Sequence, residues 1–401
     1  MVAEHARSLV FIDYGDLQAP GLLAKAFYFL TGFGHEAVMV FFVISGFLVG
    51  GKVWSLYQEG RFEWRRYLVD RVSRLYAVLF VALLLGAVLD WVGYLYFNKY
   101  GLYNHCYQGA IAVFRTAPID QMGWEDFLVN GLFLQTILGP TYGSNGPLWS
   151  LAYEWWYYIL FPLLLSSFAV FNLGNERLTK RQNNFKTDNT EFLNKNWGRR
   201  SGEPSPRALF FSGLGYLLAI GGLFFLLTWN ILILFGVWVL GVLAAVFGPK
   251  IFGFQSPVLR LWISFAALIV CVGILCVERL EIFEIGKINQ YLIGFGFVLL
   301  LMSLSAMPWH LPFYRFSQHC ADFSYSVYLV HFPVLVFTLS LTYQFIGSGI
   351  RMPFHLGAFL WYLAVLILSI LVSWSISLVT EKKTPVLRGL IYQAFKIEVK
   401  P

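Results

Sequence analysis

Nine long apolar runs constrain what this 401-residue chain can fold into. An α-helix needs about 20 predominantly apolar residues to cross the hydrocarbon core of a bilayer. Such runs lie at roughly 33–50, 73–97, 148–171, 208–226, 229–247, 261–277, 289–307, 323–345 and 357–379. They predict an all-α fold, a polytopic membrane helical bundle with nine complete transmembrane helices in the lipid bilayer. A shorter apolar piece at roughly 127–138 is predicted to be a surface or re-entrant helix.

The composition excludes several classes of protein. Apolar residues make up 58% of the chain and charged residues only 13%, about half the charged share of an ordinary soluble domain. This balance excludes a soluble globular enzyme, a disordered chain and a nucleic-acid-binding domain. The four cysteines show neither a disulfide framework nor the paired spacing of a zinc site, so no metal site is predicted.

Lysine and arginine gather on one side of the predicted bundle. The segments 51–74, 172–207 and 380–401, with three further residues, carry 22 of the 29 basic residues. By the positive-inside rule this side is cytoplasmic. We therefore predict a single membrane domain over 1–401 in the plasma (inner) membrane. Its basic insertion loop at 172–207 is expected to be unstructured and cytoplasmic, and its tail at 380–401 is also cytoplasmic.

The same topology places residues 1–30 outside, so the first complete span runs from outside to inside. A chain that starts outside without an earlier crossing implies another span upstream of Met1. We therefore expect the first helix of the bundle to be truncated in this chain.

One candidate site lies in WSLAYEWWYYILFP (149–162), where Ser150, Glu154 and Tyr157 share a helix face by their spacing. Ionisable groups inside membrane spans are costly and usually functional. Glu154 is interpreted as a carboxylate that orients a histidine or a substrate hydroxyl. The alternative is a structural glutamate that is protonated or paired with an arginine.

A second candidate site lies in DFSYSVYLVHFP (322–333), where Ser324, Tyr328 and His331 have the same spacing. Three polar groups in line on an apolar helix are typical of an internal polar path. The alternative is a core histidine whose hydrogen bonds are satisfied locally.

Two further motifs have both a structural and a functional interpretation. In DRVSRLYAV (70–78), Arg71 and Arg74 lie one turn apart at the cytoplasmic start of a span and favour a phosphate clamp, with topological anchoring as the alternative. Ser45 and Gly46 interrupt the apolar run 34–51 and favour close helix packing, with a ligand-facing surface second. His5 stands alone in a polar stretch and gives little functional signal by itself.

These motifs together resemble a known family. FFVISGFL (41–48), RVSRLY (71–76), NGPLWSLAYEWWYYILFP (145–162) and SYSVYLVH (324–331) occur in the order and spacing of the acyltransferase-3 family of integral membrane O-acyltransferases. The resemblance implies ten membrane helices. It also implies transfer of an acyl group, by family habit acetyl, from cytoplasmic acyl-CoA to an extracytoplasmic carbohydrate or glycolipid. No bound cofactor is implied, since acyl-CoA is the donor substrate.

The family also carries an arginine and a histidine on its first helix, and VAEHARSLVF (2–11) resembles the end of that helix. The resemblance therefore implies that His5 is the essential histidine, with its arginine partner upstream of Met1. His5 is expected to be a general base or a transient acyl carrier, with Glu154 orienting its imidazole. Two of the remaining expected site residues, Arg71 and Arg74, are expected to bind acyl-CoA. The others are expected to line or support the path, and they are Ser324, Tyr328, His331, Ser150 and Ser45.

Two other functions stay open beside this one. A ten-helix secondary transporter is one alternative, although the chain shows no internal repeat of the kind many transporters have. An inactive relative with the acyltransferase fold is the other. Within the acyltransferase interpretation, direct transfer and an acyl-histidine intermediate are both open routes.

Overall fold

The computed structural model describes residues 1–104, 114, 116–186, 206–253, 256–280, 286–305, 314–346 and 351–397. Within these residues there are helices and no β-strand, which confirms the predicted all-α class. The long helices are α5 (Trp64–Tyr96), α8 (Leu148–Lys186), α9 (Pro206–Leu226), α10 (Trp229–Phe252), α11 (Pro257–Arg279), α12 (Ile288–Ser305), α14 (Ser324–Ile346) and α15 (Leu356–Val379). A further long helix is built from α3 (Gly34–Ser45), a π-helical turn η2 (Gly46–Gly50) and α4 (Gly51–Gln58).

Shorter helices lie at the ends of the bundle and between the long ones. They are α1 (Val2–Val10), η1 (Tyr14–Asp16), α2 (Leu22–Leu30), η3 (Pro118–Gln121), α7 (Trp124–Gly131), α13 (Tyr314–Ala321), η5 (Glu381–Lys383) and α16 (Thr384–Ala394).

Eight helices in the described part of the chain are long and apolar enough to cross a membrane. They coincide with eight of the nine predicted spans, and the predicted polytopic helical bundle is therefore confirmed. The remaining predicted span, 208–226, falls on α9, whose apolar stretch Phe211–Leu226 is shorter than the others. The number nine therefore stays a prediction. The short apolar piece at 127–138 does not cross, because α7 ends at Gly131 and the chain turns back toward α8.

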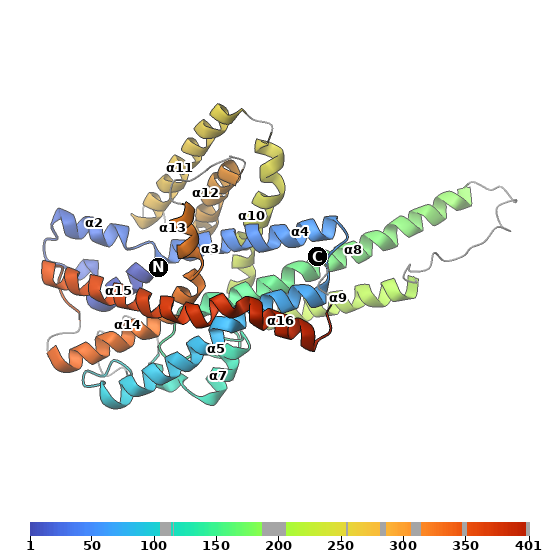
Figure 1. The fold of residues 1–401 in the computed structure, drawn as a ribbon. Coiled ribbons are helices and arrows are strands. Elements are labelled where there is room, and N and C mark those ends of the chain that lie inside the picture. Colours follow the sequence, from blue (N-terminus) through green and yellow to red (C-terminus); the bar gives the residue numbers. More distant parts are fainter. Residues whose placement is uncertain are drawn as a thin grey trace.

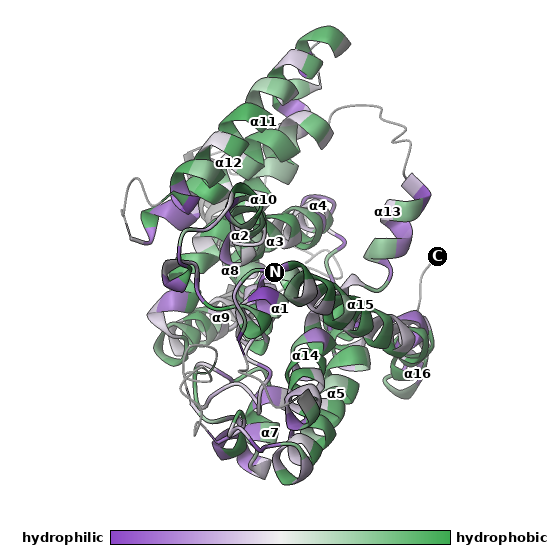
Figure 2. Ribbon diagram, turned by 90° about the vertical axis from the view of Figure 1, so that its left-hand side faces the viewer, coloured by the Kyte–Doolittle hydropathy of each residue, from purple (hydrophilic) through white to green (hydrophobic). Residues whose placement is uncertain are grey.

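The long helices pack around α14, the most deeply buried of the candidate spans. α14 contacts α1, α5 and α15, while α10 contacts α3 and α12, and α11 packs on α12 (Figure 1). α8 and α9 lie side by side and extend beyond the other helices. α1 packs against α3, α14 and α15 and brings hydrophilic residues among these apolar helices (Figure 2). The short first helix therefore delivers its polar side chains to the interior of the bundle.

Two glycines allow α3 and α10 to cross closely. A Cβ atom on Gly46 would overlap the backbone carbonyl of Trp238, and a Cβ on Gly241 would overlap the carbonyl of Val43. Small residues at a helix crossing let the two backbones approach, and the contact then holds the neighbouring side chains in fixed positions. The packing role predicted for the Ser45–Gly46 pair is confirmed for Gly46.

The prediction of an unstructured loop over 172–207 is wrong for its first part. α8 continues through residues 172–186 to Lys186, although that segment is polar and has no apolar periodicity. Adding a residue to an existing helix is far easier than starting one, so the buried part of α8 supports this polar continuation. Residues 187–205, the rest of the predicted loop before α9, lie outside the described residues.

Candidate active site

A row of polar side chains, here called the polar row, runs through the apolar interior of the bundle. Its members are His5 on α1, His331 and Tyr328 on α14, Ser150 and Glu154 on α8, Ser45 on α3, and Arg71 and Arg74 on α5. The Nδ1 atom of His5 lies 2.9 Å from the Nε2 atom of His331 on α14. The two imidazole rings are parallel, with centroids 5.2 Å apart. Phe332 presents its ring edge-on to His5 at 5.0 Å. Two residues 326 positions apart in the chain thus form a histidine pair inside the bundle.

The protonation of this pair follows from its neighbours. His331 is fully buried, and its Nδ1 atom lies 2.8 Å from the carbonyl oxygen of Val327 and 2.9 Å from that of Tyr328. Carbonyl oxygens only accept hydrogen bonds, so Nδ1 of His331 carries the hydrogen. In the neutral ring Nε2 of His331 is then an acceptor, and Nδ1 of His5 donates to it. Nε2 is then the nitrogen of His5 that carries the lone pair and can act as a base.

Tyr328 and Ser150 continue the row one helical turn from the histidine pair. The Tyr328 hydroxyl is hydrogen-bonded to the hydroxyl of Ser150 on α8, and it donates to the carbonyl of Pro147 at 2.5 Å. The Tyr328 ring is stacked on Phe41 of α3, with centroids 6.1 Å apart. These contacts join α14, α8 and α3 around one polar position.

Glu154 lies one turn further along α8 from Ser150 and is buried. Its Oε1 atom accepts hydrogen bonds from Ser45 on α3, at 2.8 Å, and from Tyr158 on α8. The indole of Trp238 donates to the Ser45 hydroxyl at 3.1 Å. A buried carboxylate needs such donors, since an unsatisfied one is costly in an apolar medium. The structure therefore explains how a glutamate is accommodated here.

Arg71 and Arg74 on α5 form the other end of the row, which the sequence predicts to be cytoplasmic. The Arg71 guanidinium lies over the rings of Tyr67 and Tyr158, 5.8 and 5.6 Å from their centroids. Its Nε atom is buried without a hydrogen-bond partner, while Arg74 is exposed. The charges of both arginines act on Glu154. A guanidinium with unused donors beside an exposed one is suited to binding an anionic group.

One further residue at this end, Glu381, was missed by sequence reasoning. Glu381 of η5 accepts hydrogen bonds from the backbone N–H of Ser326 at 3.1 Å and from its hydroxyl at 2.9 Å. The charge of Arg74 also acts on Glu381. Glu381 therefore joins the end of α15 to the start of α14. The sequence signal was a glutamate directly after a long apolar run.

Two of the residues predicted to share helix faces are not in the row. Ser324 is exposed, and its hydroxyl donates to the carbonyl of Ala321 at the start of α14. Tyr157 turns to α10, where its hydroxyl donates to the carbonyl of Ile231. Helical spacing places residues on a similar face, but neighbouring helices decide which side chains meet. The expected path-lining role of Ser324 is therefore not supported by its position.

The expected pairing of Glu154 with His5 is also corrected. The hydrogen-bond partners of Glu154 are Ser45 and Tyr158, and the ring that contacts His5 by hydrogen bond is that of His331. The residue that is hydrogen-bonded to the His5 imidazole is therefore His331. Sequence reasoning recognised His331 as polar and in line, but α1 is brought to α14 only by tertiary packing.

Asp90 on α5 is a second site that sequence reasoning missed. This fully buried carboxylate accepts hydrogen bonds from the backbone N–H of Ser144 at 2.7 Å and from its hydroxyl at 2.8 Å. The next residue, Asn145, donates to the carbonyl of Leu329 on α14 at 2.8 Å. Asp90 therefore holds the loop that leads into α8 and contacts α14. Its signal was an aspartate inside an apolar run.

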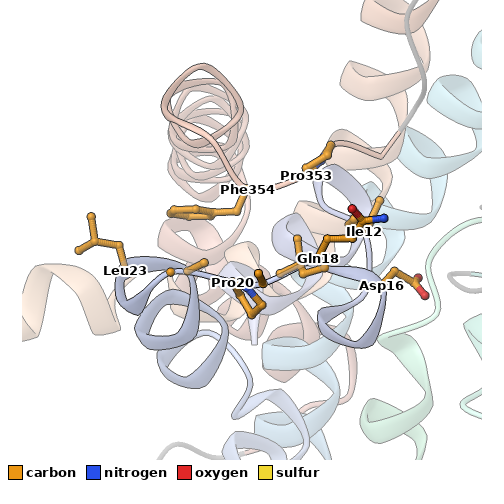
Figure 3. A pocket seen from close by; sticks show the side chains of 11 residues that line it. Ile12, Asp16, Gln18, Pro20, Leu23, Pro353 and Phe354 are labelled. Atoms are coloured by element: carbon orange, nitrogen blue, oxygen red, sulfur yellow. The ribbon is translucent and has the colours of Figure 1, made fainter.

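A separate cavity of about 600 Å³ opens beside the end of α1. Figure 3 shows its labelled lining residues, which come from the segment after α1, the start of α2 and the segment that leads into α15. They include Ile12, Asp16, Gln18, Pro20 and Phe354. None of the residues in the polar row lines this cavity, so the candidate active site is the row itself.

Comparisons with known proteins were informative at the level of the family. The acyltransferase-3 family model, described as an acyltransferase domain, matches residues 7–378. That match includes the polar-row residues on α3, α5, α8 and α14, whereas His5 lies just before it and Glu381 just after it. A protein of Haemophilus influenzae described as uncharacterized is 28% identical over 126 residues. The matched region is 31% of this chain and 47% of that relative, so the chain spans about half the relative's length. No solved structure matches.

Proposed function

This chain belongs to the acyltransferase-3 family, since the family's acyltransferase domain matches nearly its whole length, and we propose that it is an O-acetyltransferase. It moves an acetyl group from cytoplasmic acyl-CoA to a hydroxyl of an extracytoplasmic carbohydrate or glycolipid. The observation that carries the proposal is the polar row, which leads from an arginine pair at one end of α5 to a histidine whose Nε2 atom is the basic nitrogen.

The arginine end of the row is the proposed donor site. Acyl-CoA carries several phosphate charges, and Arg71 and Arg74 offer guanidinium donors one turn apart. The positive-inside rule assigns this end to the cytoplasm, where acyl-CoA is found. The protein is accordingly proposed to lie in the plasma (inner) membrane with its C-terminal tail in the cytoplasm. Glu154 and Glu381 lie close enough to Arg74 for its charge to act on both carboxyl groups.

The uncharged arm of the donor is proposed to extend along the row toward His5. Charged groups are costly inside a membrane protein, but the pantetheine arm carries hydroxyl and amide groups that need only hydrogen bonds. Tyr328 and Ser150 supply hydroxyls on this route, and Ser45 lies beside Glu154. The thioester carbonyl would reach the histidine pair at the end of the arm.

His5 is the proposed catalytic base. In direct transfer its Nε2 atom takes the proton of the acceptor hydroxyl while the hydroxyl oxygen attacks the thioester carbonyl carbon. The carbon–sulfur bond then breaks, and the departing CoA sulfur receives the proton from the His5 imidazolium. His331 keeps Nδ1 of His5 occupied as a donor, so that Nε2 is the basic atom throughout.

An acyl-histidine intermediate uses the same atoms in two steps. Nε2 of His5 attacks the thioester carbonyl carbon, the carbon–sulfur bond breaks, and CoA leaves as its thiolate. The acceptor oxygen then attacks the acetyl carbon, the bond to Nε2 breaks, and the hydroxyl proton passes through Nε2 to the thiolate. The second route predicts ping-pong kinetics and a burst of CoA release in the absence of acceptor. Measurement of that burst with purified protein separates the two routes.

The proposed function is tested on whole cells through the O-acetyl ester content of their surface glycans. A strain lacking the gene is compared with strains complemented by the native gene, by His5→Ala and by Ser324→Ala. We expect the esters to vanish on deletion and to return with the native gene and the Ser324 variant, but not with His5→Ala. Surface esters that are unaffected by deletion, or restored by His5→Ala, would contradict the proposal.

A further inference from the structure

Pro333 lies inside α14, two residues after His331. Proline has no backbone N–H, so the carbonyl of Leu329, four residues earlier, cannot receive the hydrogen bond that a regular helix supplies. The proline ring also pushes against that carbonyl and bends the helix there. Inside a membrane such a carbonyl needs a donor from a neighbouring element. The path of α14 at His331 therefore depends on the group that supplies this donor.

The donor is Asn145, in the loop that leads into α8. Its Nδ2 atom donates to the carbonyl of Leu329 at 2.8 Å. Asn145 is only 3% exposed, and its Oδ1 atom has no hydrogen-bond partner within the part of the chain that the structure describes. Buried polar atoms are nearly always satisfied, so an amide with one unsatisfied atom is placed by the bond that its other atom makes. The carbonyl of Leu329 therefore sets the position of the Asn145 side chain.

The same turn of α14 holds the imidazole of His331. Its Nδ1 atom lies 2.8 Å from the carbonyl oxygen of Val327 and 2.9 Å from that of Tyr328. The next carbonyl along the chain is that of Leu329, which accepts from Asn145. Three successive carbonyls thus accept side-chain hydrogen bonds, two from His331 itself and one from outside the helix. A shift of the backbone at Leu329 would move the two carbonyls that orient the imidazole.

The helix α5 supports both sides of this contact, and it packs along α14 (Figure 1). The ring of Pro333 lies at Gly86 of α5, where an added Cβ would be 3.7 Å from the ring. Asp90, four residues later and on the same helix face, holds Ser144 by two hydrogen bonds. Ser144 is the chain neighbour of Asn145. One face of α5 therefore fixes the proline and the loop relative to each other.

We infer that Asn145 is a positioning residue, which fixes the turn of α14 on which His331 meets His5 by donating to the carbonyl that Pro333 leaves open. The inference rests on the proposed function only in treating His5 as the base. Nε2 of His331 lies 2.9 Å from Nδ1 of His5. If the turn relaxes, His5 loses the acceptor that makes its own Nε2 the basic nitrogen. Asn145 thus acts on turnover through His331 and not by contact with a substrate.

The kinetic test uses Asn145→Leu, which removes the amide donor and changes the side-chain volume little. Purified protein in lipid nanodiscs transfers radiolabelled acetyl from acetyl-CoA to glycans extracted from a strain lacking the gene. We expect kcat to fall about tenfold or more, as is typical when the partner that orients a reactive histidine is lost. The KM for acetyl-CoA should stay within twofold of the native value, because the proposed donor site lies at the other end of the polar row.

Ser340→Ala is the matched control, because Ser340 is a buried residue of α14 whose hydroxyl donates to the carbonyl of Phe97. The contact joins α14 to the end of α5 beyond Pro333 and away from His331. Its loss should leave kcat within twofold of the native value even if the Tm falls. An equal fall of kcat in both variants, or a native kcat in Asn145→Leu, would overturn the inference.

A spectroscopic test examines the histidine contact without any assay of activity. Solid-state NMR of protein labelled with ¹⁵N-histidine identifies ring nitrogens in an N–H···N hydrogen bond, and His331→Gln identifies which signals belong to this pair. We expect Asn145→Leu to lose these signals and Ser340→Ala to keep them. Unchanged signals in Asn145→Leu would overturn the inference. A native protein that shows the signals, loses them in Asn145→Leu and transfers no acetyl would count against the proposed function alone.

A third test examines the Leu329 carbonyl itself. Pro333→Ala gives α14 its own N–H donor for that carbonyl, so Asn145 is no longer needed to satisfy it. Asn145→Leu should therefore lower the Tm less in the Pro333→Ala background than in the native protein, and thermal unfolding in detergent measures both losses. Such non-additivity is the mark of two residues that act on one group. Equal losses in the two backgrounds would show that Asn145 does not act through this carbonyl and would overturn the inference.

Discussion

Nδ1 of His5 lies 2.9 Å from Nε2 of His331, whose other ring nitrogen is held by two backbone carbonyl oxygens of α14. This relationship joins the start of the chain to a helix that begins more than 300 residues later. It also determines which nitrogen of His5 is basic, because His331 can accept a hydrogen bond only through Nε2. The histidine that the family resemblance implies to be essential is therefore hydrogen-bonded to a second histidine.

Replacement of His331 should lower turnover without weakening donor binding. His331→Leu removes the acceptor for Nδ1–H of His5, and loss of such an orienting partner typically costs about 10- to 100-fold in activity. His331→Gln should recover part of that loss, since its side-chain oxygen is an acceptor of similar reach. Steady-state kinetics with acetyl-CoA measure kcat and KM separately. A leucine variant with native kcat would contradict the orienting role.

Replacement of Arg71 or Arg74 should weaken donor binding. Each guanidinium is expected to form charge-assisted hydrogen bonds to phosphate, worth about 1.5–3 kcal/mol each, so Arg71→Gln and Arg74→Gln should each raise the KM for acyl-CoA about tenfold or more. Arg65→Gln is the control, because Arg65 lies on the same end of α5 but is exposed and outside the polar row. Unchanged KM in both test variants would remove the donor-site assignment.

Substitution of Gly46 should destabilise the bundle. The added Cβ of Gly46→Ala overlaps the Trp238 carbonyl and forces α3 and α10 apart, and overpacking of this kind costs about 1–3 kcal/mol. Thermal unfolding in detergent should show a lower Tm. Gly215→Ala on α9 provides the comparison, since its Cβ would meet open space. A native Tm for Gly46→Ala would show that this crossing has room to relax.

Loss of Asp90 should disturb the active site from a distance. Asp90→Ala leaves the backbone N–H and hydroxyl of Ser144 buried without partners, at about 1–3 kcal/mol for each group. We expect a lower Tm and a lower kcat, because the same loop contacts α14 through Asn145 and Pro147. In a double-mutant cycle, Asp90→Ala and Ser144→Ala should be non-additive. Additive effects would argue against a shared interaction.

The fold class followed from sequence because an apolar run long enough to cross a bilayer has few other stable conformations. Eight of the nine predicted spans coincide with candidate membrane helices for this reason. The unstructured loop expected at 172–207 failed in part because a helix anchored in the bundle can extend into polar sequence. The composition of residues 172–186 alone does not indicate that the buried part of α8 supports them.

Individual site residues were recognisable because ionisable and polar groups are rare inside apolar helices. Glu154, His331 and the arginine pair of α5 were identified in this way, whereas Asp90 and Glu381 carried the same signal and were missed. Helical spacing also predicted that Ser324 and Tyr157 share helix faces with the other candidate residues. In the folded protein their hydroxyls bond elsewhere, to the carbonyl oxygens of Ala321 and Ile231.

The sequence by itself determined that this protein is a polytopic helical bundle, and its motifs pointed to the acyltransferase-3 family. Only the tertiary structure decided which polar groups meet. It brought His5 to His331 rather than to Glu154, and it placed Ser45 and Tyr158 beside Glu154. The physical reason is that apolarity and periodicity are properties of one helix, whereas partner choice depends on packing between helices far apart in the chain.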